Sequence, residues 1–393
     1  MSKVYNNVLL MIGNGFDLAA KLKSSYIDFY NEVIKESSSI KQANAFIDKY
    51  VGNSTISILN LSTEFKGIKR QFLNNEIDYW SLLFDRYKTK ELESWYDIEK
   101  IIYDTLNTIN FTEIRKYLKT SEKDSLVEPK LTNDENKIFA LILYMNETKD
   151  TKSRPLYQEL IDELYKFEKK FKNYMNKVLE NHQDYGSNAK DILNKILYGL
   201  EKVSARELID RINTRGKVYL YNFNYTKPFS GYYNQFEIKS NNIHGTLDTS
   251  IIFGVDHSTT NFDDDKNIFT KAYRKMMIDT TNNVEFILNK KMKDEVEVIK
   301  IFGLSLTEPD YTYFHTIFDF YDIYNSNIVL EFYYDVYDGR RKIKEDYVLS
   351  IYNLIKTYAN KSKQEFDTKN NTLITKLIME NRLKIIDLKL SQK

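Results

Sequence analysis

Short apolar runs occur at the start of the chain and again in its second half, and each is bounded by glycine or polar turn residues. Runs of this length, rich in β-branched and aromatic residues, are typical of buried strands. The predicted strands are Asn7–Ile12, Lys217–Asn222, Asn242–His244, Ser250–Phe253, Val296–Phe302 and Ile328–Tyr334. Between about residue 36 and about residue 205 the apolar positions recur at helical spacing, which predicts long amphipathic helices.

This pattern predicts an α/β fold in which a large helical insertion interrupts an open sheet. The N-terminal strand begins the sheet, and strands after about residue 205 complete it. We expect the core to combine residues 1–35 with residues 205–320, and the insertion to span residues 36–204. Residues 321–393, with one strand and two further helices, are expected to form a C-terminal α/β cap.

Two segments of the insertion have clear local signals. Ser153 as an N-cap and Pro155 in the first turn predict a helix that begins at Arg154. Its stripe of Phe and Tyr side chains is typical of a packed core. The polar segment Lys119–Lys137, which contains Pro129, predicts an exposed loop.

The composition limits the classes of protein and of site that the chain can form. With 42% apolar residues, 29% charged residues and a formal net charge of +1, it has the balance of a folded globular protein. The absence of cysteine excludes disulfides, thiolate nucleophiles and cysteine-based zinc or iron–sulfur sites. The histidines lack metal-binding spacing, so no metal site is expected. No apolar run approaches the length of a membrane span, and we expect a soluble, cytoplasmic protein.

The strongest local motif is Gly13-Asn14-Gly15-Phe16-Asp17, which leads from the first strand into a predicted helix. Glycines at such a turn let the backbone approach a phosphate, and a helix N-terminus attracts an anion. The alternative is a tight strand-to-helix turn in which the helix dipole favours Asp17. The third glycine of a dinucleotide fingerprint would fall at Leu18, and no second strand with an acidic end follows, so a dehydrogenase is disfavoured.

Polar residues also follow two later strands. Asn224 and Thr226 come after the strand that ends at Asn222, and an Asn in that position can hold sugar hydroxyls through paired hydrogen bonds. His244 and Gly245 end the next predicted strand, where a histidine is a natural general base. The alternatives are that the Asn side chains satisfy a turn and that the histidine is a hydrogen-bonded structural residue.

A further candidate follows the predicted strand that ends at Phe302. Gly303-Leu304-Ser305 precedes a predicted helix, and the Ser305 hydroxyl is suited to a ribose or phosphate oxygen. The alternative is a cap or turn hydroxyl. The acidic run Asp263–Asp265 is interpreted as a solvated loop rather than a metal site.

Several motifs occur along the chain in a fixed order. They are Ile12-Gly13-Asn14-Gly15-Phe16-Asp17-Leu18, Ser25-Tyr26-Ile27-Asp28-Phe29, Trp95-Tyr96-Asp97-Ile98-Glu99, Asn222-Phe223-Asn224-Tyr225-Thr226, Ile243-His244-Gly245, Ile252-Phe253-Gly254-Val255-Asp256, Phe302-Gly303-Leu304-Ser305-Leu306 and Asp310 with Tyr313-Phe314. Together they resemble the AbiH family of bacterial phage abortive infection proteins, and the resemblance spans nearly the whole chain. Lys21 and Leu304 depart from the family, which often has glycine and histidine there.

The family resembles, more distantly, the sirtuin-like NAD-consuming domains of antiphage defence, which share this order of motifs. This resemblance implies a Rossmann-like, sirtuin-like nucleotide-binding core without a zinc ribbon. It implies that Asn224 and His244 are catalytic, whereas Thr226 stands where those enzymes usually have Asp. The residues assigned to nucleotide binding are Gly13, Asn14, Gly15, Phe16, Asp17, Thr226, Gly303 and Ser305.

The resemblances imply an abortive-infection effector that binds NAD and hydrolyses it to nicotinamide and ADP-ribose. NAD would be the substrate, and no prosthetic group is expected. One alternative is a sensor that binds a nucleotide or ADP-ribose without cleaving it, which the Thr226 departure favours. Another is a nuclease, which the near-zero net charge disfavours. A phage-derived trigger and a second copy of the chain are further candidate partners, and no membrane partner is expected.

Overall fold

The computed structural model divides into two compact units, each drawn from segments that are separate in the sequence. Unit 1 comprises Met1–Ser24, Val178–Ile251 and Lys275–Lys393, and unit 2 comprises Ser25–Lys177 and Ile252–Arg274. The residues described are 5–52, 63–87, 95–120, 130–146, 155–199, 216–229, 231–233, 236–256, 264–278, 288, 290–307, 310–335, 342–361 and 372–390.

Unit 1 contains a seven-stranded sheet with the order β3-β4-β2-β1-β5-β6-β7. Neighbouring strands are parallel, except that β3 is antiparallel to β4. The strands are β1 (Asn7–Ile12), β2 (Gly216–Asn222), β3 (Gly231–Tyr233), β4 (Phe236–Asn242), β5 (Val298–Phe302), β6 (Val329–Tyr334) and β7 (Leu383–Asp387). The expected fold class, an α/β Rossmann-like open sheet with a helical insertion, is therefore confirmed.

The central strands β1, β2 and β5 lie where the apolar runs predict them. Parallel strands covered on both faces are almost entirely buried, so their sequences are near-continuous apolar runs. The strand predicted at Ser250–Phe253 is wrong. Only Ile251 pairs there, in a single bridge with Gly245, and the chain then enters unit 2. The strand predicted at Asn242–His244 is shifted, since β4 ends at Asn242 and His244 lies in the turn beyond it.

The C-terminal region, residues 321–393, continues the sheet of unit 1 instead of capping it. β6 pairs with β5, and β7 pairs with β6. The physical reason is that β6 is as thoroughly buried as the central strands. The core and the C-terminal region therefore belong to one unit.

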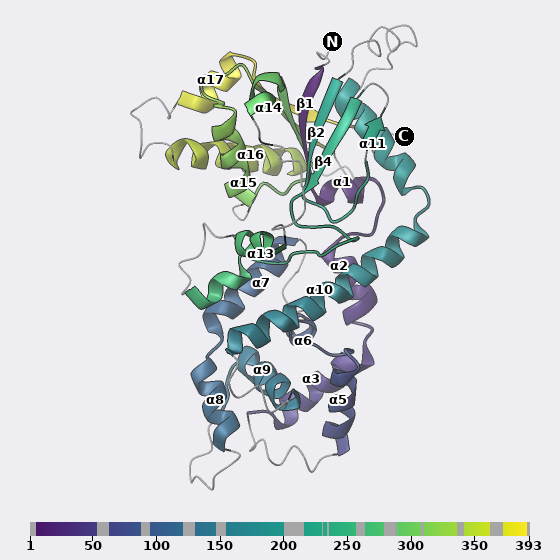
Figure 1. The fold of residues 1–393 in the computed structure, drawn as a ribbon, viewed down its shortest axis with the longest axis vertical. Helices are drawn as coiled ribbons and strands as arrows, with labels where there is room; N and C mark the ends of the chain where they lie inside the picture. Colours follow the sequence, from purple (N-terminus) through teal and green to yellow (C-terminus); the bar gives the residue numbers. More distant parts are fainter. Residues whose placement is uncertain are drawn as a thin grey trace. The chain divides into compact units, whose positions relative to one another are not determined.

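Helices cover both faces of the sheet (Figure 1). On one face, the ammonium group of Lys300 in β5 reaches the backbone carbonyl of Ile196 in α11. On the other face, Leu9, Ile299 and Phe332 share an apolar core with side chains of α14, α15, α16 and α17. The helices of unit 1 are α1 (Asn14–Ala19), α11 (Tyr185–Tyr198), α14 (Lys290–Glu295), α15 (Tyr311–Phe320), α16 (Lys342–Lys361) and α17 (Leu373–Met379). This arrangement is the doubly wound one.

Unit 2 is helical and has an aromatic core. The ring of Phe29 packs against Phe167 and Phe171 of α10, with centroids 5.6 and 5.1 Å apart. Its elements are α2 (Tyr26–Phe29), a π-helical turn (Tyr30–Ile34), α3 (Ser38–Tyr50), α5 (Thr63–Leu73), α6 (Tyr79–Tyr87), α7 (Trp95–Thr108), α8 (Phe111–Thr120), α9 (Asp134–Met145) and a 3₁₀ helix (Asp264–Phe269). Two of the four boundaries between the units fall within helices, in α10 (Leu156–Asn181) and α13 (Lys271–Ile278), and the other two follow Ser24 and Ile251.

The long helix predicted from Arg154 is α10, although Ser153 and Arg154 lie outside the described residues. The loop predicted at Lys119–Lys137 is wrong at both ends, since α8 extends to Thr120, and residues 121–129 lie outside the described residues. Helix α9 already begins at Asp134, because the Asn133 side chain caps it by accepting a hydrogen bond from the Asn136 backbone at 2.9 Å.

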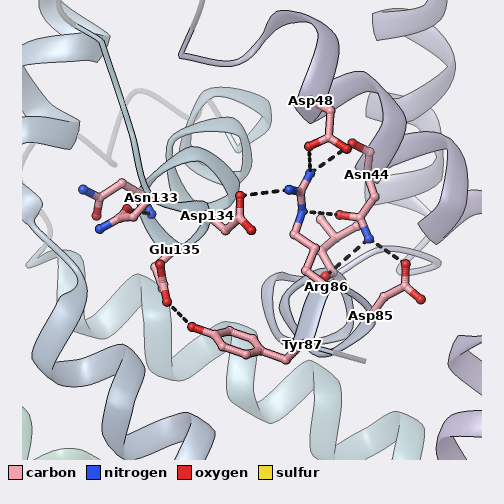
Figure 2. A network of polar contacts seen from close by, with 10 residues as sticks. Asn44, Asp48, Asp85, Arg86, Tyr87, Asn133, Asp134 and Glu135 are labelled. Carbon is pink, nitrogen blue, oxygen red and sulfur yellow. Dashed lines mark hydrogen bonds and ion pairs between the residues drawn. The ribbon is translucent and has the colours of Figure 1, made fainter. Parts of the chain in front are cut away.

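Figure 2 shows a polar network that joins three helices of unit 2 around Arg86 of α6. Its guanidinium donates to Asn44 Oδ1 at 2.8 Å and pairs with Asp48 at 2.8 Å, both on α3. It also pairs with Asp134 of α9 at 2.9 Å. The fork geometry of arginine lets one side chain fix three helices.

A buried ion pair holds the segment Ile252–Arg274 within unit 2. The Arg274 guanidinium contacts both carboxylate oxygens of Glu168 in α10, at 2.5 and 2.8 Å. The Phe253 backbone N–H donates to the same carboxylate at 2.6 Å. This pair explains why a segment between β4 and β5 belongs with the helices and not with the sheet.

Candidate functional site

The parallel strands end at one edge of the sheet in unit 1, and the predicted site residues follow the ends of β1, β2, β4 and β5. When the parallel strands alone are numbered along the chain, their order is 3-2-1-4-5-6. β2 and β4 extend the sheet on one side of β1, and β5, β6 and β7 extend it on the other. Ligands of such sheets bind beyond the carboxyl ends of the strands where the order reverses, here at β1 and β5.

At this point two turns pack together through their backbones. Gly13 N donates to Phe302 O at 3.1 Å, and Gly15 N donates to Gly303 O at 2.8 Å. A Cβ at Gly15 would lie 2.7 Å from Gly303 Cα, and Gly303 itself has a φ of 75°. Neither position accepts a side chain without strain. Close packing of the two backbones is therefore sufficient to explain why glycine occupies positions 15 and 303.

The rest of the β1 turn is also engaged within unit 1. Phe16 N donates to Gly13 O at 2.8 Å, and the buried Phe16 ring packs edge-on against Phe302. The half-buried Asn14 accepts a hydrogen bond from Ser24 Oγ through its Oδ1 at 2.6 Å. Of the residues predicted to bind a nucleotide in this turn, Phe16 is thus a core residue, and the amides of Gly13, Gly15 and Phe16 donate to protein carbonyls.

Side-chain amides from β2 and β4 hold the Asn222–Thr226 turn. Asn222 Nδ2 donates to Thr226 O at 2.7 Å, and Asn222 Oδ1 accepts from Asn224 N at 3.0 Å. Asn242 Nδ2 donates to Asn224 O at 2.8 Å and to Thr226 O at 2.9 Å. Asn224 Nδ2 donates to Gly13 O at 3.0 Å, which ties this turn to the end of β1.

Asp17 of α1 contacts this turn and has only 1% of its surface exposed. Its Oδ1 accepts from Tyr185 Oη of α11 at 2.7 Å, and its Oδ2 accepts from Thr226 Oγ1 at 2.9 Å. The Asn224 side chain is a further hydrogen-bond partner. We call Asp17, Tyr185, Thr226 and Asn224 the Asp17 cluster. All partners of the carboxyl group in this cluster are uncharged.

Burial raises the pKa of Asp17 to about 7, because the hydrogen bonds from Tyr185, Thr226 and Asn224 offset only part of the lost hydration. The pKa of Tyr185 is also raised, by burial and by the neighbouring Asp17. Asp17 therefore changes ionisation near neutral pH while Tyr185 remains protonated.

His244 lies on the loop that follows β4 and is 8% exposed. Its ring contacts the rings of Phe223 and Tyr313, with centroids 5.6 and 5.7 Å away. The same loop is joined to the neighbouring turn by the hydrogen bond from Leu247 N to Tyr225 O at 3.1 Å. The predicted base is thus on a loop bound to the segment that carries Asn224.

Ser305 lies on the loop after β5, where its exposed hydroxyl is 3.1 Å from Thr307 Oγ1. The buried Leu304 beside it fills the space next to Gly13, where an added Cβ would meet Leu304 Cδ2 at 2.6 Å. The structure therefore brings Gly13, Asp17, Asn224 and Thr226 into one hydrogen-bonded group. His244 and Ser305 lie on separate loops, after β4 and β5.

Sequence reasoning missed three members of the site: Tyr185, Asn222 and Asn242. Tyr185 is 168 residues from Asp17 and lies in the predicted helical insertion, so nothing local indicated the contact. Asn222 and Asn242 are the last residues of β2 and β4, and a polar residue at the end of a buried strand was the available signal.

The described ranges contain no group of three or more His, Asp or Glu side chains arranged to hold a metal ion. In those same ranges no helix is both long enough and apolar enough to cross a membrane.

Residues 9–334 match the family model described as "Bacteriophage abortive infection AbiH". No curated protein and no solved structure matches the chain. The matched range includes residues 9–12 of β1, the Asp17 cluster, His244 and Ser305.

Proposed function

The chain belongs to the AbiH family of bacteriophage abortive infection proteins, and we propose that it acts in abortive infection by binding NAD at the carboxyl edge of its sheet and hydrolysing it to nicotinamide and ADP-ribose. One observation carries the proposal. The parallel strands have the order of a dinucleotide-binding sheet, and amide, hydroxyl and carboxyl groups gather at the ends of β1 and β2.

The order of motifs adds a second argument. A glycine turn, an Asn segment, a His-Gly pair and a Gly-x-Ser segment occur in the order found in sirtuin-like NAD-consuming domains, which matches Asn224 and His244 to their catalytic residues. Thr226 replaces the Asp that is usual there, and its hydroxyl is bonded to Asp17. In this proposal Asp17 supplies from α1 the carboxyl group that the turn itself lacks.

The chemistry needs few protein groups. The C1′–N bond of the nicotinamide riboside breaks, and its electron pair passes to the pyridinium nitrogen, so nicotinamide leaves as a neutral molecule without a general acid. A water oxygen forms the new bond to C1′, and its proton passes to the His244 imidazole. The Asn224 side-chain amide donates to Gly13 O and is also a hydrogen-bond partner of Asp17. Asn224 would therefore act through Oδ1, as an acceptor for a ribose hydroxyl or the water.

The test is product analysis by liquid chromatography after incubation of the purified protein with NAD. The wild type should release nicotinamide and ADP-ribose, and His244→Ala should be slower by roughly 100-fold to 10,000-fold. His182→Ala is the matched control, because His182 lies at the end of α10, where its ring nitrogen contacts the Val178 carbonyl. Equal rates for the two variants would remove His244 from the mechanism.

A second candidate is a sensor that binds NAD or ADP-ribose and leaves it intact. The observation that favours it is the engagement of the site in internal hydrogen bonds, with Asn224 only 4% exposed and Thr226 only 1% exposed. Calorimetric titration with each nucleotide separates the two functions. Binding without nicotinamide release supports the sensor, and the absence of both binding and release contradicts both candidates.

A further inference from the structure

Thr226 is the residue at which the contacts of the Asn222–Thr226 turn converge. Its carbonyl accepts from Asn222 and Asn242, at 2.7 and 2.9 Å. Its hydroxyl donates to Asp17, the one side chain in this set that comes from α1. The side-chain amides of Asn222 and Asn242 therefore hold the Thr226 backbone, whereas Asp17 holds the Thr226 side chain.

Asp17 is itself held by a hydrogen bond from helix α11. The Tyr185 hydroxyl of α11 donates to Asp17 Oδ1 at 2.7 Å and also lies 3.2 Å from Thr226 Oγ1. The hydroxyl groups of Tyr185 and Thr226 both donate to Asp17, so this carboxyl group joins α11 to the Asn222–Thr226 turn. Substitution of Asp17, Tyr185 or Thr226 therefore removes at least one of the hydrogen bonds that hold the turn.

We propose that Asp17 is a positioning residue for Asn224, which it holds in place through its hydrogen bond from the Thr226 hydroxyl and its contact with the Asn224 side chain. For its importance to activity this inference rests on the proposed function, since Asn224 is the residue that would meet the ligand. The positioning itself is a property of the unliganded chain.

Burial supports a role for the ionisation state of Asp17. Among the described residues, the groups that face its carboxyl group are Tyr185 on α11 and the uncharged Thr226 and Asn224 on the turn after β2. None of them supplies a positive charge, so the closed turn favours the neutral carboxyl group, whose pKa is raised to about 7. A conformation in which the turn opens and water reaches Asp17 binds the proton less tightly. Opening is therefore favoured as the pH rises towards about 7.

Hydrogen–deuterium exchange of the unliganded protein tests the positioning, with the backbone amides of residues 222–226 measured from about pH 5 to about pH 8 and corrected for intrinsic exchange. In the wild type, opening of the turn should increase by up to about tenfold per pH unit and level off above about pH 7. Asp17→Asn, which mimics the neutral acid, should remove this pH dependence.

Variants of Thr226 separate positioning from a general loss of structure. Thr226→Val should raise exchange of the turn roughly tenfold at every pH, because the hydroxyl bond is lost, and Thr226→Ser should restore protection. Tyr358→Phe is the matched control, since it removes a hydrogen bond of 2.8 Å from a tyrosine to Asp319 on α15. If Asp17→Asn does not fold, the contrast between Thr226→Val and Thr226→Ser decides.

The proposal is overturned if exchange of residues 222–226 in Thr226→Val equals that in Tyr358→Phe, or if the wild-type profile has no dependence on pH. Calorimetric titration with NAD gives the link to function, and Thr226→Val should bind NAD roughly tenfold more weakly than Tyr358→Phe. Unchanged NAD affinity in a variant with a loosened turn also overturns the proposal. If the wild type itself binds no NAD, the proposed function fails, and the exchange experiment alone decides the positioning.

Discussion

Two buried clusters of titratable side chains lie in unit 1. They differ in whether the buried carboxyl group has a positively charged partner. The Asp17 cluster surrounds a carboxyl group with hydroxyl and amide groups alone. In the second cluster, Lys300 of β5 pairs with Glu331 of β6 at 3.1 Å and donates to Tyr333 Oη at 3.0 Å. Lys384 of β7 contacts the other oxygen of Glu331 at 3.1 Å. We call these four residues the Lys300 cluster.

The pKa of each carboxyl group reflects this difference. Burial alone would raise the pKa of Glu331, but Lys300 and the hydrogen bonds from Tyr333, Lys300 and Lys384 lower it below its usual value. Glu331 is therefore ionised at neutral pH and acts as a fixed structural charge, whereas Asp17, which has no charged partner among the described residues, titrates near neutral pH. The absence of a counter-ion distinguishes a group poised to change its charge from one that holds strands together.

The strongest test of the Lys300 cluster is Lys300→Met. The substitution removes the main partner of the buried Glu331 carboxylate, so the free energy of unfolding should fall by roughly 3 to 5 kcal/mol. Chemical denaturation at neutral pH measures this loss.

Lys384→Met is the matched control, because its ammonium pairs with the same carboxylate but is 28% exposed. Its cost should be about 1 kcal/mol or less, since the remaining charge pair is intact. Removal of both charges, in Lys300→Met with Glu331→Leu, should recover part of the loss. Equal losses for the two lysine variants would show that the Lys300 cluster is not held by its buried charge pair.

The sequence predicted the strands that are completely buried and misplaced or missed strands that are only partly buried. β1 and β5 are continuous apolar runs, and their positions follow directly from the sequence. The second half of β4 is Lys-Ser-Asn-Asn, and β7 is only partly buried, so neither carries a strong apolar signal. Their positions depend on pairing with β2 and β6, which no local pattern encodes.

The sequence predicted only those residues of the candidate site that closely follow the ends of predicted strands. Asn224 and Thr226 follow β2, and Asp17 follows the glycine turn of β1, so their meeting at one edge is a consequence of the parallel sheet. The position of Tyr185 was not predictable, because α11 reaches Asp17 through tertiary packing. The close contact between Gly15 and Gly303 was likewise hidden, although each glycine alone was a visible signal.

The Asp17 cluster predicts an unusual dependence of stability on pH. In the unfolded chain an Asp ionises near pH 4, whereas in the folded chain Asp17 ionises near pH 7. Between these values the folded state holds a proton that the unfolded state has lost, so the contribution of Asp17 to the free energy of unfolding falls as the pH rises. It levels off above about pH 7, after a loss of at most about 4 kcal/mol.

Denaturation of the wild type and of Asp17→Asn at several pH values isolates this contribution from that of the other carboxyl groups. The two proteins should have similar stabilities near pH 4, and the variant should be the more stable one near pH 8. A wild type that gains stability relative to the variant with rising pH would mean that Asp17 is held as a carboxylate. The contrast with the Lys300 cluster would then disappear.

The smallest effect compares two tyrosines that donate to carboxyl groups, Tyr185 in the Asp17 cluster and Tyr358 of α16 with the exposed Asp319. Tyr358→Phe should cost about 1 kcal/mol at both pH 5 and pH 8. Tyr185→Phe should cost a similar amount near pH 5 and about 1 kcal/mol more near pH 8, because its hydrogen bond lowers the pKa of Asp17 and so favours the charged form. The difference in unfolding free energy between the two variants, measured at each pH, tests this. A difference that does not change with pH would show that Tyr185 contributes only packing, and that Thr226 and Asn224 alone balance the charge of Asp17.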